Sequence, residues 1–323
     1  MGSPADVYPM VSDATAIELP LWEVDTARPG PRRTRRLRTA QRRAGIVFAL
    51  PVILLELAFL ALPLGTAIFH SFTSWDGLSS TWIGLGNYQR LFGDPTFWDI
   101  VRNNVYLLLS VPIAILIPLL VAYLLNEHVP GWQFFRSAYF LPTAISWVVI
   151  GMVAIRFFAG EGMLNHLLED IGLGGIRLNL LGGETSAMVA VIITFIWSVF
   201  GTNTIIFVTG MATLDRDIHE AARVDGAGSL TIFRRITIPM LMRFIQFAFI
   251  LTLITAFTAL FSLIFVMTGG GPGYGTTTLE FYVYQQGFTV GVFGYAAAIG
   301  IVLFAVVFAI SVAQLRIFKS RLD

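Results

Sequence analysis

Long apolar runs separated by short polar segments fill most of this sequence of 323 residues. A helix needs about 20 apolar residues to cross a hydrocarbon layer about 30 Å thick. Runs of that length predict six transmembrane helices, at about residues 45–69, 103–125, 137–158, 187–211, 243–267 and 291–315. We therefore expect an all-α polytopic membrane protein with a six-helix domain over residues 44–318.

Residues 1–43 differ from the rest of the chain because they are polar and contain eight arginines between Arg28 and Arg43. The apolar run that follows is too long for a signal peptide, and no A-x-A cleavage site comes after it. We interpret the segment as a disordered basic tail on the cytoplasmic side. Membrane topology accounts for its charge, so no nucleic-acid partner is expected.

Charge is sparse, at 13% of residues, and it is distributed unevenly. If the N-terminus is cytoplasmic, all but four of the 21 Lys and Arg residues fall on the cytoplasmic side, the four being Arg90, Arg102, Arg156 and Arg177. This is the bias expected of cytoplasmic loops, and it predicts that both termini are cytoplasmic. The absence of cysteine excludes disulfides, iron–sulfur clusters and cysteine-based catalysis.

A polar segment with many small residues, EAARVDGAGSLTIFRRITIP, lies in the predicted cytoplasmic loop 212–240. Asp217 and Glu220 have the spacing of a capping box, which favours a helix start there. Gly226 suits a helix stop that needs a positive φ, and Ser229 can cap a second short helix. The segment therefore predicts two short helices joined by a glycine turn.

Helices this short do not persist alone in water, so we expect the loop to dock on a partner. From physical arguments alone, an ordinary connecting loop is the alternative. The segment resembles the EAA motif of importer-type ABC transporter permeases, and the one loosening is Ile238 where Leu is common. The residues that carry the resemblance, with Ile236, are Glu220, Ala221, Ala222, Asp225, Gly226, Ala227, Phe233 and Pro239.

The resemblance extends from about residue 45 onward and is strongest to the sugar-importing branch, the maltose and glycerol-3-phosphate transporter permeases. The stretches that carry it are GLGNYQRLFGDPTFW, FFRSAYFLPTAIS, GMLNHLLEDIGL, TGGGPGYGTTTLEFYVYQQGF and GYAAAIG. The first 43 residues do not match and form a private extension.

The resemblance implies a transport subunit rather than an enzyme, in a bacterial-type inner membrane. It would translocate a sugar or related polyol that an extracytoplasmic binding protein delivers. Its implied partners are a second permease subunit, with which it would form a heterodimer, and two ATPase subunits coupled through the EAA helices. No G-x-x-x-x-G-K-[ST] loop occurs, so ATP and Mg are expected on the partner ATPases, with no cofactor on this chain.

Polar and aromatic residues in the fourth and fifth predicted spans are candidates for the substrate path. Thr194, Ser198 and Thr202 recur along one helix face, although packing explains most membrane Ser and Thr residues. An amide is costlier to leave unpaired than a hydroxyl, so a path role is more attractive for Asn203, with a bond to the partner permease as the alternative. The candidate path residues are Trp197, Asn203, Thr255, Phe257 and Thr258.

Glu56 lies in the middle of the first span, where a carboxylate needs a partner or a proton. The resemblance assigns it no role. A secondary carrier driven by protons or ions is the alternative function, but such carriers usually have internal repeats and several intramembrane charges. A membrane-embedded enzyme is less favoured still, because the four histidines are scattered and form no metal motif: His70, His128, His166 and His219.

Overall fold

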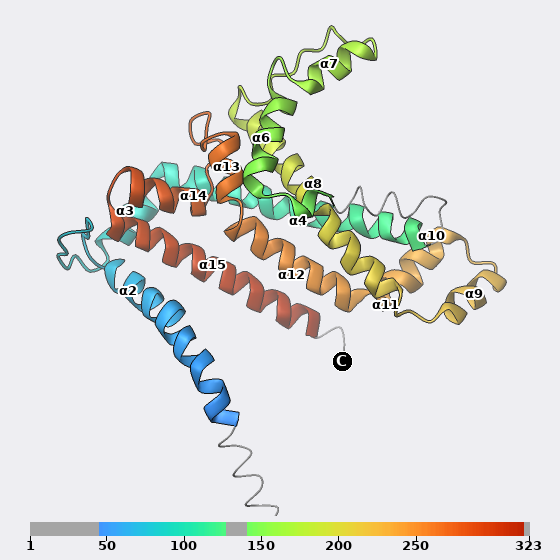
Figure 1. Cartoon of the computed structure of the whole chain (residues 1–323), viewed down its shortest axis with the longest axis horizontal. Helices are drawn as coiled ribbons and strands as arrows, with labels where there is room; N and C mark the ends of the chain where they lie inside the picture. Colours follow the sequence, from blue (N-terminus) through green and yellow to red (C-terminus); the bar gives the residue numbers. More distant parts are fainter. Residues whose placement is uncertain (1–44, 127–140, 320–323) are drawn as a thin grey trace, which may run out of the picture. The chain divides into compact units, whose positions relative to one another are not determined.

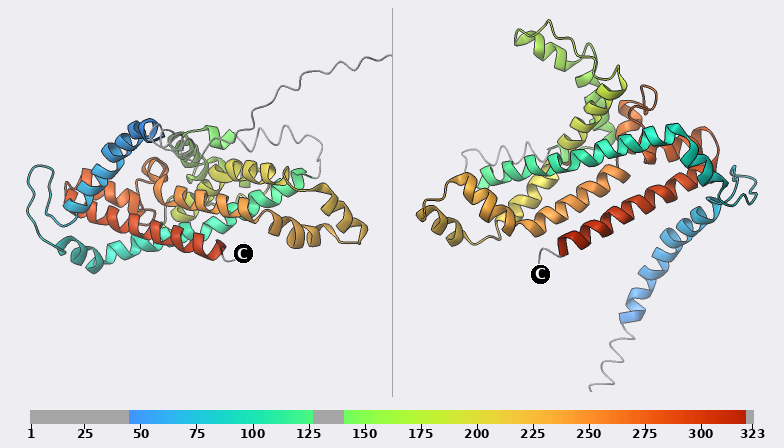
Figure 2. Two further views of the ribbon diagram at one scale, coloured as in Figure 1. Left: turned by 90° about the horizontal axis from the view of Figure 1, so that it is seen from below. Right: turned by 180° about the vertical axis from the view of Figure 1, so that it is seen from behind.

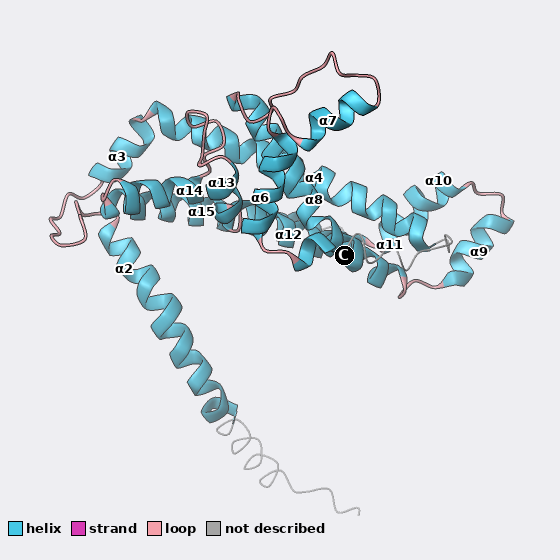
Figure 3. Ribbon diagram, turned by 45° about the horizontal axis from the view of Figure 1, so that its top comes forward, coloured by secondary structure: helices cyan, strands magenta, loops and turns pink. Residues whose placement is uncertain are grey.

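The computed structural model describes residues 45–126 and 141–319, and the chain divides into two compact units, Met1–Ala61 and Leu62–Asp323. Every regular element in the described ranges is a helix (Figure 3). Outside the helices, one isolated antiparallel bridge joins Thr73 and Trp82. The predicted all-helical class is therefore confirmed for this part of the chain. The basic tail, residues 1–43, lies outside the described residues.

The described part of the first unit is a helix that ends in a π-helical turn, η1 (Leu57–Ala61). Glu56 directly precedes this turn and its side chain is exposed. The division between the units falls within the candidate span Gly45–His70, which continues as α2 (Leu62–His70). A single π turn inserted in an α-helix often marks a functional position.

Four helices are long and apolar enough to cross a membrane: Gly45–His70, Pro95–Leu125, Glu184–Met211 and Phe293–Arg316. Two bent pairs of helices could each supply one more span, so the described chain has four to six candidate spans. The pairs are Trp147–Phe158 with Met163–Asp170, bent by 42°, and Ser229–Met240 with Met242–Thr258, bent by 73°. The long helices are α4 (Pro95–Asn126), α8 (Glu184–Met211) and α15 (Phe293–Lys319).

The third predicted span, 137–158, is not one continuous helix. Helix α6 (Trp147–Phe158) begins only after Ser146, whose hydroxyl accepts a hydrogen bond from the Val149 amide at 3.4 Å. Residues 137–140 lie outside the described range. The chain then bends into α7 (Met163–Asp170). A serine in the extended conformation caps a helix start, which explains why α6 begins here.

The fifth predicted span, 243–267, is also wrong as a continuous helix. Helix α12 (Met242–Thr258) ends before Ala259, and α13 (Phe261–Met267) starts anew. The freed amide of Phe261 donates to Oε2 of Glu280 at 3.0 Å, from α14 (Leu279–Tyr284). A carboxylate at a helix N-terminus satisfies an orphan amide and complements the helix dipole, so Glu280 stabilises the break.

The helices of the second unit pack around one main core. Helix α4 packs along α8 and α12, α13 packs against α6, and α15 packs against α2, α12 and α14 (Figure 1). Buried apolar side chains from α4, α6, α8, α12 and α13 fill this core, among them Leu107, Ile150, Phe195, Leu253 and Leu263. A smaller cluster joins α3 (Gly86–Gly93), α4, α14 and α15 around Tyr295.

The second unit has two different ends, which Figure 2 shows at opposite extremes of the bundle. We name one the cap end: the loop 71–85, α3, the loop 268–278, α14 and the start of α15. The other is the loop end, formed by α9 (Arg216–Val224), α10 (Ser229–Ile232) and α11 (Ile238–Met240). The functional residues predicted from the EAA resemblance all lie at the loop end.

Candidate functional site: a docking hairpin and a polar cavity

Helix α9 opens a hairpin that connects α8 to α12, and we name residues 215–240 the docking hairpin. Its N-cap is Asp215, whose Oδ1 accepts a hydrogen bond from the Asp217 amide at 3.0 Å. The predicted capping box of Asp217 and Glu220 is therefore wrong, because the helix starts two residues earlier than expected. Glu220 instead lies inside α9 with an exposed side chain.

The turn after α9 requires a glycine. Gly226 has a φ of 82°. Its amide donates to the Arg223 carbonyl at 3.0 Å, and the Ala227 amide donates to the Ala222 carbonyl at 2.9 Å. These two bonds form a Schellman motif, the usual way to satisfy the last carbonyls of a helix. The predicted positive φ at Gly226 is confirmed.

The second arm of the docking hairpin runs from α10 through a π-helical segment, η2 (Phe233–Thr237), into α11. Gly228, and not Ser229, is the N-cap residue of α10, so the predicted serine cap is wrong. Ile232, Phe233 and Thr237 are buried beneath this arm. The helical segment Ser229–Met240, which includes η2, is followed by a 73° bend at Leu241, after which α12 begins.

The tip of the docking hairpin is exposed and mixes charge with apolar surface. Glu220 and Asp225 are exposed, as are Arg234 and Arg235 on the second arm. Two apolar side chains flank the glycine turn in the open, with Val224 87% and Leu230 68% accessible. A rigid turn that presents both apolar and charged side chains has the composition of a protein interface.

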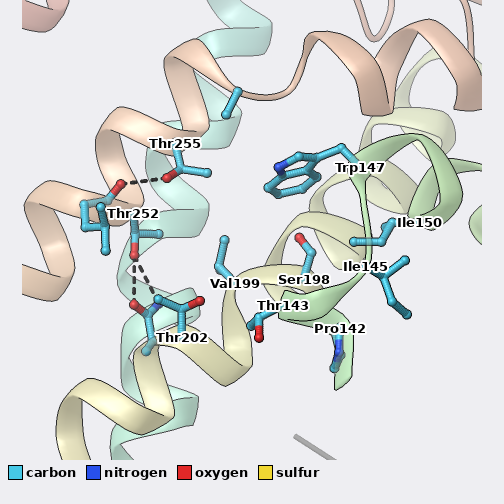
Figure 4. Close-up of a pocket in the computed structure, with 13 residues that line it drawn as sticks. Pro142, Thr143, Ile145, Trp147, Ile150, Ser198, Val199, Thr202, Thr252 and Thr255 are labelled. Atoms are coloured by element: carbon cyan, nitrogen blue, oxygen red, sulfur yellow. Dashed lines mark hydrogen bonds between the residues drawn. The ribbon is translucent and has the colours of Figure 1, made fainter. Parts of the chain in front are cut away.

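A cavity of about 300 Å³ lies between α6, α8 and α12 (Figure 4). Its volume is at the low end of the usual range for small-molecule sites, about 300–1,000 Å³. Hydroxyl groups, one amide and the Trp147 indole alternate with apolar side chains around it, and among residues 45–126 and 141–319 no charged side chain contributes. The polar residues of the lining, with Trp147, are Thr143, Ser198, Thr202, Asn203, Thr252 and Thr255.

Asn203 joins three helices beside this cavity. Its Nδ2 donates to the Ala114 carbonyl of α4 at 2.9 Å and to Thr252 Oγ1 of α12 at 3.0 Å. Ala114 lies four residues before Pro118, which has no amide hydrogen to give that carbonyl. Asn203 supplies the missing donor, as neighbouring helices do for prolines in membranes. The amide predicted to need a ligand is thus satisfied within the chain.

Several side chains around the cavity already donate hydrogen bonds within the chain and still offer acceptors. Ser198 Oγ donates to the Phe195 carbonyl at 2.8 Å, and Thr255 Oγ1 donates to the Leu251 carbonyl at 2.8 Å. A hydroxyl that donates once still has acceptor lone pairs. The lining therefore suits an uncharged ligand that brings its own hydroxyl donors.

The structure separates the predicted path residues. Asn203 and Thr255 line the polar cavity, whereas Trp197 lines a second, apolar cavity of about 380 Å³ between α6 and α8. Phe257 is buried in the main core, and Thr258 is exposed with its hydroxyl bonded to the Ile254 carbonyl. Neither of these two residues lines the polar cavity.

Sequence reasoning missed Trp147 and Thr143 as residues of the cavity. Both lie near the start of α6, inside the predicted span 137–158, which we expected to be one continuous helix. Residues 141–144 are helical and the break falls at Ile145 and Ser146, where the local sequence pattern gave no clear signal. Among the described residues, no three His, Cys, Asp or Glu side chains are grouped as metal ligands would be.

These features define a polytopic helical transport subunit with a cavity in its bundle and an exposed hairpin at one end. Residues 91–323 match the model of the family described as binding-protein-dependent transport system inner membrane component. The chain belongs to this family, whose members are permease subunits of ABC transporters and leave ATP hydrolysis to separate subunits.

Two curated relatives align with this chain over almost their whole length. A probable ABC transporter permease protein, YurN of Bacillus subtilis, is 35% identical over 85% of this chain and 95% of its own. The multiple sugar-binding transport system permease protein MsmF of Streptococcus mutans is 31% identical over the same shares. A solved structure also matches: a bacterial alginate ABC transporter in complex with a periplasmic protein that is bound to an alginate pentasaccharide. The matching chain is 25% identical, with a TM-score of 0.73, over 86% of this chain and 96% of that one.

Proposed function

We propose that this chain imports an uncharged sugar or related polyol across a bacterial-type inner membrane. It does so with a second permease subunit, in a heterodimer, and with two ATPase subunits that bind ATP and Mg. An extracytoplasmic binding protein delivers the sugar to the cap end. Both termini and the docking hairpin lie in the cytoplasm, which agrees with the concentration of arginine in the tail and in the hairpin.

The observation that carries the sugar assignment is the lining of the polar cavity. Sugar hydroxyls are hydrogen-bond donors, and the cavity offers acceptor lone pairs from Ser198 and Thr255. The Trp147 indole provides an aromatic face of the kind that packs against a sugar ring. A phosphate ester or an acidic sugar would need a cationic partner, and the described residues of the lining include none. MsmF, a relative named for multiple sugars, supports the same class.

The docking hairpin is the proposed contact with the ATPase subunit. The EAA residues named from the sequence fall on α9, its glycine turn and the second arm. Exposed Val224 and Leu230 would enter a groove on the ATPase, and Glu220 would meet a basic or polar group there. Phe233 is buried instead, so its proposed role is to hold the hairpin on the bundle.

The sugar assignment can be tested in proteoliposomes that contain the full complex and its loaded binding protein. Trp147→Leu should raise the KM for uptake or change sugar selectivity while the complex stays assembled. Trp197→Leu is the matched control, because its indole lines the separate apolar cavity. Equal uptake kinetics in the Trp147 variant and the wild type would remove the polar cavity from the path. Ion-driven uptake by this chain alone would favour the secondary carrier instead.

The ATPase contact can be tested by charge reversal at the hairpin. Glu220→Lys should reduce copurification of the ATPase subunit in detergent, while Glu220→Gln should reduce it less. Asp170→Lys serves as the control, since Asp170 is an exposed acid at the end of α7, far along the chain from the hairpin. If the Glu220→Lys complex keeps its ATPase subunit and its full stimulated hydrolysis, Glu220 is only a solvated side chain.

A further inference from the structure

Helix α4 contacts the docking hairpin through Tyr123, although the hairpin is joined covalently only to α8 and α12. Tyr123 Oη donates to the Ser229 carbonyl at 3.3 Å, and its ring lies 4.8 Å from the ring of Phe233. Both side chains are almost fully buried, with 8% and 5% of their surface accessible. The second arm of the hairpin therefore rests on the end of α4.

The first arm is connected to the second by a side-chain hydrogen bond. His219 Nε2 in α9 lies 3.0 Å from Thr237 Oγ1 in η2, and the threonine is buried. His219 Nδ1 lies 3.4 Å from the Asp215 carbonyl at the start of α9. This hydrogen bond connects α9 to η2, and the ring contact of Phe233 connects η2 to Tyr123.

Helix α4 also reaches the polar cavity. Ala114 lies nine residues before Tyr123, about 13 Å along a helix axis that rises 1.5 Å per residue. Its carbonyl is the one that Pro118 leaves without an amide and that Asn203 binds at 2.9 Å. Asn203 is bonded in turn to Thr252, and both line the cavity. Pro118 stands between the hairpin contact and the cavity contact, where a proline allows a helix to bend.

We propose that α4 transmits movement of the docking hairpin to the polar cavity, with Tyr123 as the contact, Pro118 as the hinge and the Asn203–Ala114 hydrogen bond as the link to the cavity wall. This inference rests on the proposed function. Tyr123 is a positioning residue, since it is buried against the hairpin and does not line the polar cavity. The path differs from the covalent route through α8 and α12, so it can be interrupted without altering either connection.

The experiment uses the natural absence of cysteine in this chain. A single reporter, Thr255→Cys, is placed in the cavity of the full complex, and its uptake is measured first as the baseline. The rate of modification by a membrane-impermeant thiol reagent is then compared with and without a non-hydrolysable ATP analogue. In the reporter background the analogue should change this rate by about fivefold or more, the lower bound of typical coupling between sites.

Tyr123→Leu should abolish most of this ATP-dependent change and lower the sugar taken up per ATP hydrolysed, while the ATPase subunit stays bound. Tyr106→Leu is the matched control, because Tyr106 is an exposed tyrosine on the same helix. Pro118→Ala should act similarly, since the new amide competes with Asn203 for the Ala114 carbonyl. If Tyr123→Leu does not assemble, Tyr123→Phe and Pro118→Ala decide the question.

Two results would overturn the inference: an unchanged ATP-dependent labelling ratio in the assembled Tyr123 and Pro118 variants, or equal losses in the Tyr106 control. The proposed function is judged separately, from the wild-type arm. Wild-type complex that shows no uptake dependent on the binding protein would refute the proposed function, whatever the variants do.

Discussion

The cap end and the loop end treat their polar groups in opposite ways. At the cap end, Asn87 Nδ2 donates to the Ser71 and Thr73 carbonyls at 2.9 and 2.8 Å, and Asn103 Nδ2 donates to the Tyr274 and Thr277 carbonyls at 2.7 and 2.9 Å. These asparagines are buried and tie loops distant in sequence to helices. At the loop end, charged and apolar side chains of the docking hairpin are exposed instead. Buried, bonded amides hold a fixed surface, whereas the hairpin is left open for a partner.

Gly294 at the cap end and Gly226 at the loop end are required for different physical reasons. Gly294 in α15 has an ordinary φ, but a Cβ there would meet the Thr73 carbonyl and lie 2.8 Å from the Trp75 amide nitrogen. Gly226 has open space around it and needs glycine only for its φ of 82°. Close packing therefore requires the first glycine, and backbone conformation requires the second.

Gly294→Val should give the largest effect on stability. The added side chain meets backbone atoms of the loop 71–85, which cannot move as a flexible side chain can. Overpacking of this kind typically costs about 1–3 kcal/mol and sometimes more. The melting temperature of the complex in detergent should fall, and Gly300→Val is the control because α15 has more space there. Equal melting temperatures would show that the cap end is not held by this close approach.

Gly226→Val should abolish transport with a smaller effect on stability. A β-branched residue in the left-handed region costs about 1–2 kcal/mol, so the turn would change conformation and displace the tip of the docking hairpin. The expected result is normal expression with ATP hydrolysis uncoupled from uptake. Gly228→Val, at a glycine with a negative φ of −70° and open space, is the matched control. Normal uptake by Gly226→Val would show that the turn geometry is not needed for coupling.

Glu280 lies in α14 at the cap end, outside the candidate spans, and it should make the stability of the protein depend on pH. Burial raises the pKa of its carboxyl from 4.5 to about 6, although the Phe261 amide opposes the shift. The folded protein thus holds its proton more tightly than the unfolded chain, and stability should decline as the pH rises from about 4.5 to above 6.

The measurement is the melting temperature of the complex across that pH range. Glu280→Gln keeps an acceptor for the Phe261 amide and should remove this part of the pH dependence. Glu280→Ala leaves the amide without its acceptor and should lower stability by about 1–3 kcal/mol at every pH. A Gln variant with the wild-type pH profile would assign the dependence to another group.

Substitution of Asp76 should have the smallest effect on stability. Hydrogen bonds from the Ser79 and Leu78 amides lower the pKa of its carboxyl to about 2, at an exposed turn of the loop 71–85. Its contribution should be present above pH 3.8 and be lost as the pH falls towards 2, outside the working range of a transporter. Asp76→Asn should speed amide hydrogen exchange at residues 77–80 without changing the melting temperature. A marked fall in melting temperature would show that the turn supports the whole cap end.

The sequence alone predicted the features that depend on local pattern. Apolar runs of sufficient length predicted the all-helical class and the long helices α4, α8 and α15. The EAA resemblance led to the family, and the helix–glycine–helix pattern predicted the positive φ of Gly226. These predictions succeed because hydrophobic length and the steric limits on φ act on neighbouring residues.

Only the tertiary structure decided where helices break and which residues share a cavity. Glu280 caps the start of α13 from 19 residues further along, and Asn203 reaches a carbonyl 89 residues away that Pro118 had freed. Trp147 is likewise far in sequence from Ser198, Thr252 and Thr255, whose hydroxyls line the same polar cavity. A buried amide, amide hydrogen or carboxylate must find a partner wherever the packed helices provide one, and no local pattern states which helix that will be.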